Sequence, residues 1–174
     1  MKSYIKRFDL HPPFAFTLSP LIQDRLRELQ RQRRHPILQN LIEWAILPAN
    51  QLQLKIEYVA GVSLKNWIYG HYSKDTLNFD VPQVSRMLEQ FSNELEHSQL
   101  IHGDLNPGNL ILTGKGIVAI DWLIDLSSPQ GTPLFSHPNL FKGKPRSRDT
   151  DKFAIDLIAA FVLKNKGVNS IYDG

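Results

Sequence analysis

The chain has 174 residues, of which 42% are hydrophobic and 21% are charged, and its formal net charge is +3. This balance argues against a disordered chain and predicts one domain, or two lobes that share one site. The lack of cysteine excludes disulfides and thiolate metal sites, and short apolar runs without a secretory signal predict a cytoplasmic protein that makes no membrane contact.

The first predicted elements are a strand and a helix. Residues 3–10 mix aromatic and aliphatic side chains with charges, as a short strand does. Ser19 followed by Pro20 predicts the N-cap and first turn of a helix that runs to about residue 34. Its apolar stripe is predicted to consist of Leu21, Ile22, Leu26 and Leu29.

Part of the positive charge comes from a cluster on this helix, formed by Arg25, Arg27, Arg31, Arg33 and Arg34. At helical spacing such a cluster is typical of a solvated face, although a basic run can also bind nucleic acid. No aromatic side chains are interleaved with the arginines for base stacking, so nucleic-acid binding is not expected.

A hairpin and two helices are predicted next. Residues 37–47 and 51–59 are apolar or alternate with period two around a turn at 48–50, which predicts a hairpin with one buried face. Ser63 is a candidate N-cap for a helix that follows it. A periodic helix is then predicted over residues 84–98, with its buried face formed by Val84, Met87, Leu88, Phe91 and Leu95.

The stretch from His102 to Leu112 places an acid, a flexible turn and an amide ahead of an apolar run. Its sequence is His-Gly-Asp-Leu-Asn-Pro-Gly-Asn-Leu-Ile-Leu. A second acid, Asp121, ends the next apolar run, seventeen positions after Asp104. Two strands joined by a turn at 113–116 span this distance, and such a hairpin returns its end beside its start. We therefore expect both acids and Asn109 to converge.

Phosphoryl transfer requires such a set. Asp104 is the candidate catalytic acid/base, which takes the proton of the attacking hydroxyl; the alternative is an Asp that caps a turn before Pro107. Asn109 and Asp121 are the candidate Mg²⁺ ligands. The amide oxygen of Asn109 is expected to fold back toward Asp104. His102 is expected to be structural and to pack under the loop.

The pattern His-Gly-Asp-Leu-x-Pro-x-Asn, followed by Ile-Asp-Trp, resembles the protein-kinase-like superfamily, which includes protein kinases and the aminoglycoside and choline phosphotransferases. This resemblance implies ATP and Mg²⁺ as cofactors. Gly103 and Trp122 resemble the small-molecule branch, because protein kinases usually carry Arg and Phe at these places. Without an Arg at position 103, a switch operated by a phosphorylated activation segment is not expected. Asn106 stands where Ser/Thr protein kinases commonly have Lys.

The resemblance also implies nucleotide-binding residues in the first 60 positions. Lys6 would hold the phosphates, with an exposed strand lysine as the alternative. Glu28 would pair with Lys6, and Asp24 is a second candidate; both acids could instead pair with neighbouring arginines. Glu57 and Val59 would lie in the hinge, whose backbone groups bind the adenine edge.

Two C-terminal segments extend the resemblance. Residues 131–139, Gly-Thr-Pro-Leu-Phe-Ser-His-Pro-Asn, resemble the end of a protein-kinase activation segment, which implies a protein substrate. Asn139 replaces the usual final Glu. In the last helix, which residues 149–156 begin, Asp151 would brace the backbone of the catalytic loop and Asp149 would be the N-cap.

The expected fold class is α+β, a minimal protein-kinase-like fold truncated at both ends. Residues 1–60 would form a small antiparallel sheet with one helix, and residues 61–174 a mainly helical lobe. No Gly-rich loop precedes Lys6, so we expect weak ATP binding and slow transfer unless a protein partner covers the site.

The favoured function is an enzyme that transfers the ATP γ-phosphate, with Mg²⁺, to a Ser or Thr hydroxyl of a protein substrate. Two alternatives stay open. One is a pseudokinase or regulatory binding domain without catalysis, and the other is a phosphotransferase that acts on a small-molecule alcohol.

Overall fold

The computed structural model describes residues 2–9, 19–32, 35–48, 51–72, 78–98, 100–122, 126 and 132–167. The chain divides into two compact units, residues 1–59 and residues 60–174. Both combine strands with helices, so the fold class is α+β, as predicted. Within the described ranges, none of the helices is long and apolar enough to cross a membrane.

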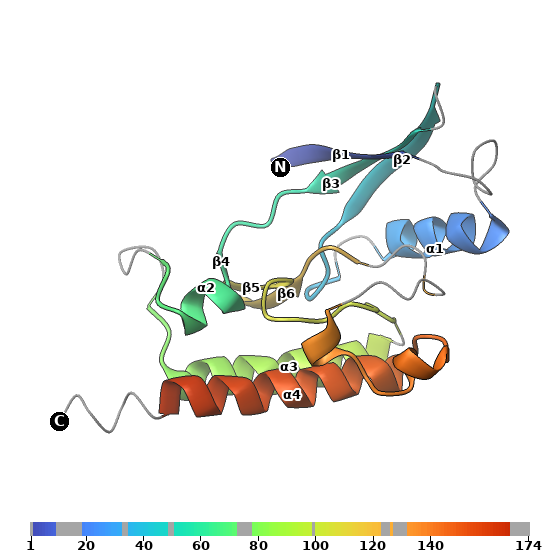
Figure 1. The fold of residues 1–174 in the computed structure, drawn as a ribbon. Helices are drawn as coiled ribbons and strands as arrows, with labels where there is room; N and C mark the ends of the chain where they lie inside the picture. Colours follow the sequence, from blue (N-terminus) through green and yellow to red (C-terminus); the bar gives the residue numbers. More distant parts are fainter. Residues whose placement is uncertain are drawn as a thin grey trace. The chain divides into compact units, whose positions relative to one another are not determined.

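The first unit contains an antiparallel three-stranded sheet (Figure 1). Its strands are β1 (Ser3–Asp9), β2 (Leu41–Leu47) and β3 (Gln51–Glu57), in the order β1-β3-β2. The alternation predicted for β3 is confirmed, because every second residue of this strand is buried. Strand β2 begins four residues later than predicted, since the chain before it forms a turn in which the N–H of Leu38 donates to the carbonyl of His35.

Helix α1 (Pro20–Arg31) packs against β2 and confirms the predicted cap, because the Ser19 hydroxyl accepts from the N–H of Ile22 at 3.3 Å. Two predictions for its faces were wrong. Leu21 is 80% exposed, whereas Arg25 is only 5% exposed. A side chain belongs to the buried face when it lies three or four positions from the others on that face, and Arg25 meets this condition with Ile22 and Leu29. Arg33 and Arg34 lie outside the described residues.

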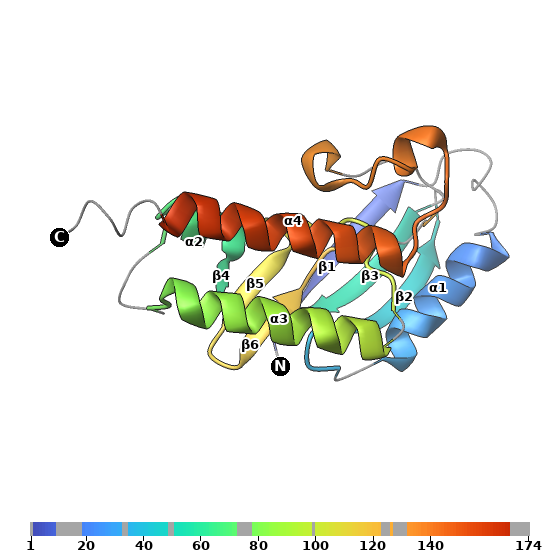
Figure 2. The same ribbon diagram turned by 90° about the horizontal axis from the view of Figure 1, so that it is seen from below.

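The second unit pairs a small antiparallel sheet with two long helices. The strands are β4 (Val62–Ser63), β5 (Leu110–Thr113) and β6 (Gly116–Ala119), in the order β4-β5-β6. The helices are α2 (Leu64–Ile68), α3 (Val81–Ser98) and α4 (Arg148–Gly167), with short 3₁₀ turns η1 (Pro133–Phe135) and η2 (Leu140–Lys142) before α4. Helices α3 and α4 lie side by side (Figure 2), and β6 packs on α3.

The core of the second unit comes from the periodic faces that the sequence predicts. Helix α3 buries Val84, Leu88, Phe91 and Leu95, while Met87 is half-buried at the margin of this face. Helix α4 and the hairpin add the buried side chains Leu110, Leu112, Ile117, Ile155, Ile158 and Val162. Burial of large aliphatic side chains, worth about 1.5–3 kcal/mol each, is therefore the main term that holds the α3–α4 pair under the hairpin.

The start of helix α3 lies three residues before the predicted start. The Asp80 carboxylate accepts from the N–H of Gln83 at 2.7 Å, and the Gln83 amide oxygen accepts from the N–H of Asp80 at 3.0 Å. This reciprocal capping box satisfies two N–H groups that a helix start leaves open. The Asp-x-x-Gln spacing was the sequence signal that could have placed this boundary.

Gly61, just before β4, lies so close to β5 that any side chain at this position should destabilise the protein. A Cβ atom at this position would lie 2.2 Å from the Leu112 carbonyl oxygen and 2.7 Å from a methyl group of Ile111. We expect Gly61→Ala to lower the free energy of unfolding by about 1–3 kcal/mol in urea denaturation, because the backbone at position 61 and the backbone at Leu112 have to move apart. Gly114→Ala is the matched control, since a Cβ there meets nothing within 4 Å. Equal losses in both variants would contradict this close approach.

Candidate active site

The loop between α3 and β5 is held by a buried histidine. His102 is 0% exposed, its Nε2 lies 2.8 Å from the carbonyl of Ile120, and its Nδ1 accepts from the N–H of Asp104 at 3.2 Å. These partners require a neutral ring with its proton on Nε2. The ring also packs against Trp122 with a centroid distance of 4.6 Å. His102 therefore fastens the loop to the far end of the β5–β6 hairpin, as expected of a structural residue.

Asp151 braces the backbone of the same loop from helix α4. It is 2% exposed, and its two carboxylate oxygens accept from the N–H of His102 at 2.5 Å and from the N–H of Gly103 at 2.9 Å. The predicted bracing role is confirmed by these contacts. Gly103 has φ +90°, a conformation that favours glycine, so the brace holds a backbone turn that few other residues could form.

The predicted N-cap of helix α4 was wrong. Helix α4 begins at Arg148, and Asp149 is exposed within its first turn. The hydroxyl of Thr150 accepts from the N–H of Ser147 at 3.0 Å, and the Ser147 carbonyl accepts from the N–H of Asp151 at 3.2 Å. Ser147 and Thr150 thus close the first turn. Asp151 lies three and four positions before the buried residues Ala154 and Ile155, so it shares the buried side of the helix.

Asp104 occupies a half-buried position with its carboxylate held in place. One oxygen accepts from the backbone N–H of Thr132 at 2.8 Å, and the other lies 3.5 Å from the amide nitrogen of Asn109. The amide of Asn106 joins the group, because it donates to the Thr132 hydroxyl at 3.0 Å and to the Asp104 carbonyl at 3.2 Å. Sequence reasoning missed the contact with Thr132, because the two residues are far apart in the chain. Gly131 lies outside the described residues.

The side chain of Asn109 points differently from the prediction. Its amide nitrogen, not its oxygen, faces Asp104 and donates to the Asp104 carbonyl at 2.9 Å. The reason is chemical: the carbonyl and the carboxylate of Asp104 are acceptors, so only the donor end of the amide can face them. Among the described residues, none donates a hydrogen bond to the Asn109 amide oxygen, which leaves this oxygen for a cation.

Asp121 comes to the same end of the hairpin as Asn109. Strands β5 and β6 pair Leu110 with Ala119, and the N–H of Ile120 donates to the Asn109 carbonyl at 2.9 Å. Asp121, the next residue, is exposed and has φ +59°. A left-handed backbone at a non-glycine residue costs free energy, and such positions cluster at functional sites. The hairpin therefore returns the second acid to the loop that carries the first.

The donor set at this end of the hairpin fits Mg²⁺. Mg²⁺ prefers oxygen ligands, and at phosphate-transfer sites it takes one or two carboxylates and fills its other positions with water and phosphate. Asp121 and Asn109 offer a carboxylate and an amide oxygen. The described part of the chain holds no group of three or more His, Cys, Asp or Glu residues that could hold a metal.

Arg146 is a residue that sequence reasoning missed. It lies in the extended segment between η2 and α4, it is 7% exposed, and its Nη1 donates to the carbonyl oxygen of Gly103. Burial lowers the pKa of Arg146, while the nearby carboxylates of Asp104 and Asp151 oppose this by raising it. Arg146 lies in a polar segment without periodicity, so no local pattern marks it as buried.

The candidate residues of the first unit lie on β1, on α1 and after β3. Lys6 is half-buried and is paired in register with Leu54. Glu28 accepts from Arg25 at 2.7 Å and Asp24 accepts from Arg27 at 3.0 Å, which are the arginine pairs given above as the alternative. The pairing of either acid with Lys6 stays a prediction.

The hinge candidates differ in how their backbone groups are used. The Glu57 carbonyl accepts from the side chain of Gln39 at 2.8 Å, and its N–H donates to the carbonyl of Asn40 at 3.0 Å. Within the described ranges, the backbone of Val59 makes no hydrogen bond. Of the two residues, Val59 therefore has the open backbone groups that binding of an adenine edge would use.

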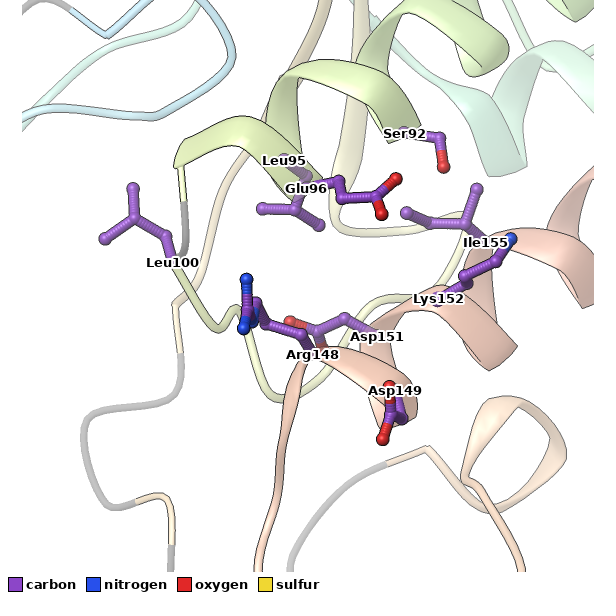
Figure 3. A pocket seen from close by; sticks show the side chains of 9 residues that line it. All are labelled: Ser92, Leu95, Glu96, Leu100, Arg148, Asp149, Asp151, Lys152 and Ile155. Atoms are coloured by element: carbon purple, nitrogen blue, oxygen red, sulfur yellow. The ribbon is translucent and has the colours of Figure 1, made fainter.

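A cavity of about 220 Å³ lies between α3 and the first turns of α4 (Figure 3). Leu95, Leu100 and Ile155 contribute its apolar wall, and the charged side chains around it carry both signs. Asp151 also borders it, but Asp104, Asn109 and Asp121 do not. The cavity is therefore separate from the group of residues that phosphoryl transfer would use.

The chain belongs to the phosphotransferase enzyme family, whose model matches residues 7–123 and so includes the loop and the hairpin. Solved structures with a similar fold include the kinase PK-1 of Cydia pomonella granulovirus, with a TM-score of 0.64 and 16% sequence identity. That match covers 92% of this chain and 59% of the viral kinase, so the chain spans less than two thirds of that protein. The protein-kinase-like fold is thereby confirmed. No curated protein matches the sequence.

Proposed function

We propose that the protein transfers the γ-phosphoryl group of ATP, with Mg²⁺, to the hydroxyl of a Ser or Thr side chain on a protein. The single observation that carries the proposal is the convergence of Asp104 and Asn109 on one loop with Asp121 at the end of the adjoining hairpin. These are the proton acceptor and the two metal ligands that such a reaction needs, and the family match supports the same chemistry.

In this proposal Asp104 orients the attacking hydroxyl. The Thr132 N–H holds one carboxylate oxygen, so the other can accept the hydroxyl proton as the oxygen–phosphorus bond forms. The amide of Asn109 limits rotation of the loop by bonding the Asp104 carbonyl. Positioning of this kind accounts for much of the catalysis of phosphoryl transfer, because the protein does little covalent chemistry itself.

Asn109 and Asp121 would hold the metal. When bound, Mg²⁺ neutralises negative charge on the phosphates and orients them. The contribution of the chain is to present an amide oxygen and a carboxylate from the same end of one hairpin. In the first unit, Lys6 would hold phosphate oxygens, with Glu28 or Asp24 as its partner, and Val59 would bind the adenine edge. A protein partner would cover the phosphates of the bound nucleotide.

A protein substrate is favoured by the segment around Thr132. This residue contacts both the candidate base Asp104 and Asn106, so the segment that resembles a protein-kinase activation segment borders the reacting position. A small-molecule alcohol is the second candidate, because Gly103 and Trp122 resemble the small-molecule branch of the superfamily.

The test uses the full chain with Mg²⁺, labelled ATP and two acceptor sets, casein and a panel of small sugars and amino alcohols. Label on Ser or Thr of casein, or on the protein itself, is the expected result. Label on a small alcohol alone would replace protein by small molecule as substrate. Nucleotide binding without transfer to either set would overturn the proposal in favour of a regulatory binding domain.

Asp121→Asn should weaken the use of Mg²⁺. An amide ligates a hard cation less strongly than a carboxylate, so the Mg²⁺ concentration for half-maximal transfer should rise by at least about 10-fold, the typical cost of losing even an indirect metal contact. The measurement is a Mg²⁺ titration of the transfer rate at fixed ATP. Asp149→Asn removes an exposed carboxylate from the same unit and should leave the titration unchanged. Identical Mg²⁺ curves for both variants would exclude Asp121 as a ligand.

A further inference from the structure

We propose that Arg146 is a positioning residue for the transfer reaction, whose buried guanidinium fixes the Gly103 peptide and borders the same crevice as Asp104. The inference deepens the proposed function and rests on it. It adds to the site a residue from the segment before α4, which lies outside both the stretch from His102 to Leu112 and the β5–β6 hairpin.

The first step is the peptide that Arg146 holds. Gly103 directly precedes Asp104, and its φ of +90° sets the direction in which the chain enters the candidate base. Asp151 accepts from the N–H of Gly103 at 2.9 Å, while Nη1 of Arg146 donates to the carbonyl of Gly103. The residue before Asp104 is thus held at both its N–H and its carbonyl by buried charged side chains, which restricts rotation about its φ and ψ.

The second step is the burial of the guanidinium. Lys144 and Arg148, on either side, are exposed, whereas Arg146 is 7% exposed. Removal of a charge from water costs several kcal/mol unless partners compensate for it, and an apolar residue of similar size would pack here without that cost. A charge at this position therefore points to a role that an apolar side chain could not fill.

The third step is the charge that Arg146 faces. The carboxylates of Asp104 and Asp151 both act on the guanidinium, and the three residues border one crevice together with Gly103. The crevice has a volume of about 10 Å³, which is at the lower limit for one water molecule. Arg146 and Asp151 are both buried, so their charges interact more strongly than those of exposed ion pairs do. The positive charge of Arg146 thus offsets the repulsion between the carboxylates of Asp104 and Asp151.

This arrangement has a consequence for regulation. Position 103 is Gly, so no arginine adjacent to Asp104 is present to bind a phosphorylated residue. Arg146 comes from a different segment, and its hydrogen bond to the Gly103 carbonyl involves no phosphate group. We therefore expect treatment of the protein with a phosphatase to leave its transfer rate unchanged.

The experiment compares Arg146→Lys and Arg146→Met with the exposed control Arg148→Met, at equal concentrations of folded protein. We expect Arg146→Met to lower kcat about 100-fold, the loss typical of a small displacement of a reacting group, with KM for ATP unchanged. Arg146→Lys should recover part of this loss because it keeps the charge. Unchanged kcat in Arg146→Met would overturn the proposal, and so would equal losses in Arg146→Met and Arg148→Met.

A second measurement needs no catalysis. The shift of the urea midpoint caused by Arg146→Met is measured in the wild-type chain and in the Asp104→Asn background. A smaller shift in the Asp104→Asn background is expected, because the charge that Arg146 faces is already gone. Equal shifts would overturn the link between Arg146 and Asp104. If the wild-type protein transfers no phosphate but the shifts differ, the proposed function fails while this link stands.

Discussion

Asp104→Asn is expected to lower the rate of phosphoryl transfer by about 10²- to 10⁴-fold, the usual contribution of a positioned acid or base. Asn has nearly the same shape, and its amide oxygen can still accept from the N–H of Thr132, so the loop should keep its conformation. The amide cannot accept the hydroxyl proton, however. The rate should therefore fall while nucleotide binding is retained.

The measurement is single-turnover transfer from labelled ATP, with nucleotide affinity determined separately. Asp156→Asn is the matched control, because this carboxylate is exposed on α4 and pairs only weakly with Lys152 at 3.2 Å. Its rate should equal that of the wild type. An Asp104→Asn protein that kept the wild-type rate would place the proton acceptor on another residue.

Asp151→Ala is expected to have the largest effect on stability, a loss of about 3–5 kcal/mol in the free energy of unfolding, as when one member of a buried charged network is removed. Two buried N–H groups, those of His102 and Gly103, would lose their acceptor. Arg146 would also lose one of the two carboxylates that offset its burial. Asp151→Asn should lose less, because its amide keeps one acceptor oxygen.

Urea denaturation followed by tryptophan fluorescence would measure this loss, since Trp67 is 2% exposed in the same unit and reports its unfolding. Lys152→Ala, the next residue on α4, is exposed and should change stability by no more than about 0.5 kcal/mol. A small effect of Asp151→Ala would mean that water or another group replaces the carboxylate. In that case the loop would not depend on helix α4.

The local chemistry of the loop was predictable from the sequence. The turn over Pro107 and Gly108, the two strands of the hairpin and the return of Asp121 all follow from residues within about twenty positions of one another. The same holds for the caps at Ser19 and Ser63. Turn types, strand periodicity and caps depend on neighbours in the chain, so the sequence contains most of the information that they require.

Only the tertiary structure showed which distant groups meet at Asp104. The contacts of Thr132 and Arg146 with the loop join residues that are far apart in the chain, and neither residue has a periodic pattern that marks it. The orientation of the Asn109 amide depended on which acceptors surround it, and the burial of Arg25 depended on which face of α1 meets the sheet. The sequence by itself therefore determined the parts of the site that one short segment forms. Long-range packing decided the rest, because it sets which charges and hydrogen-bonding groups share a buried space.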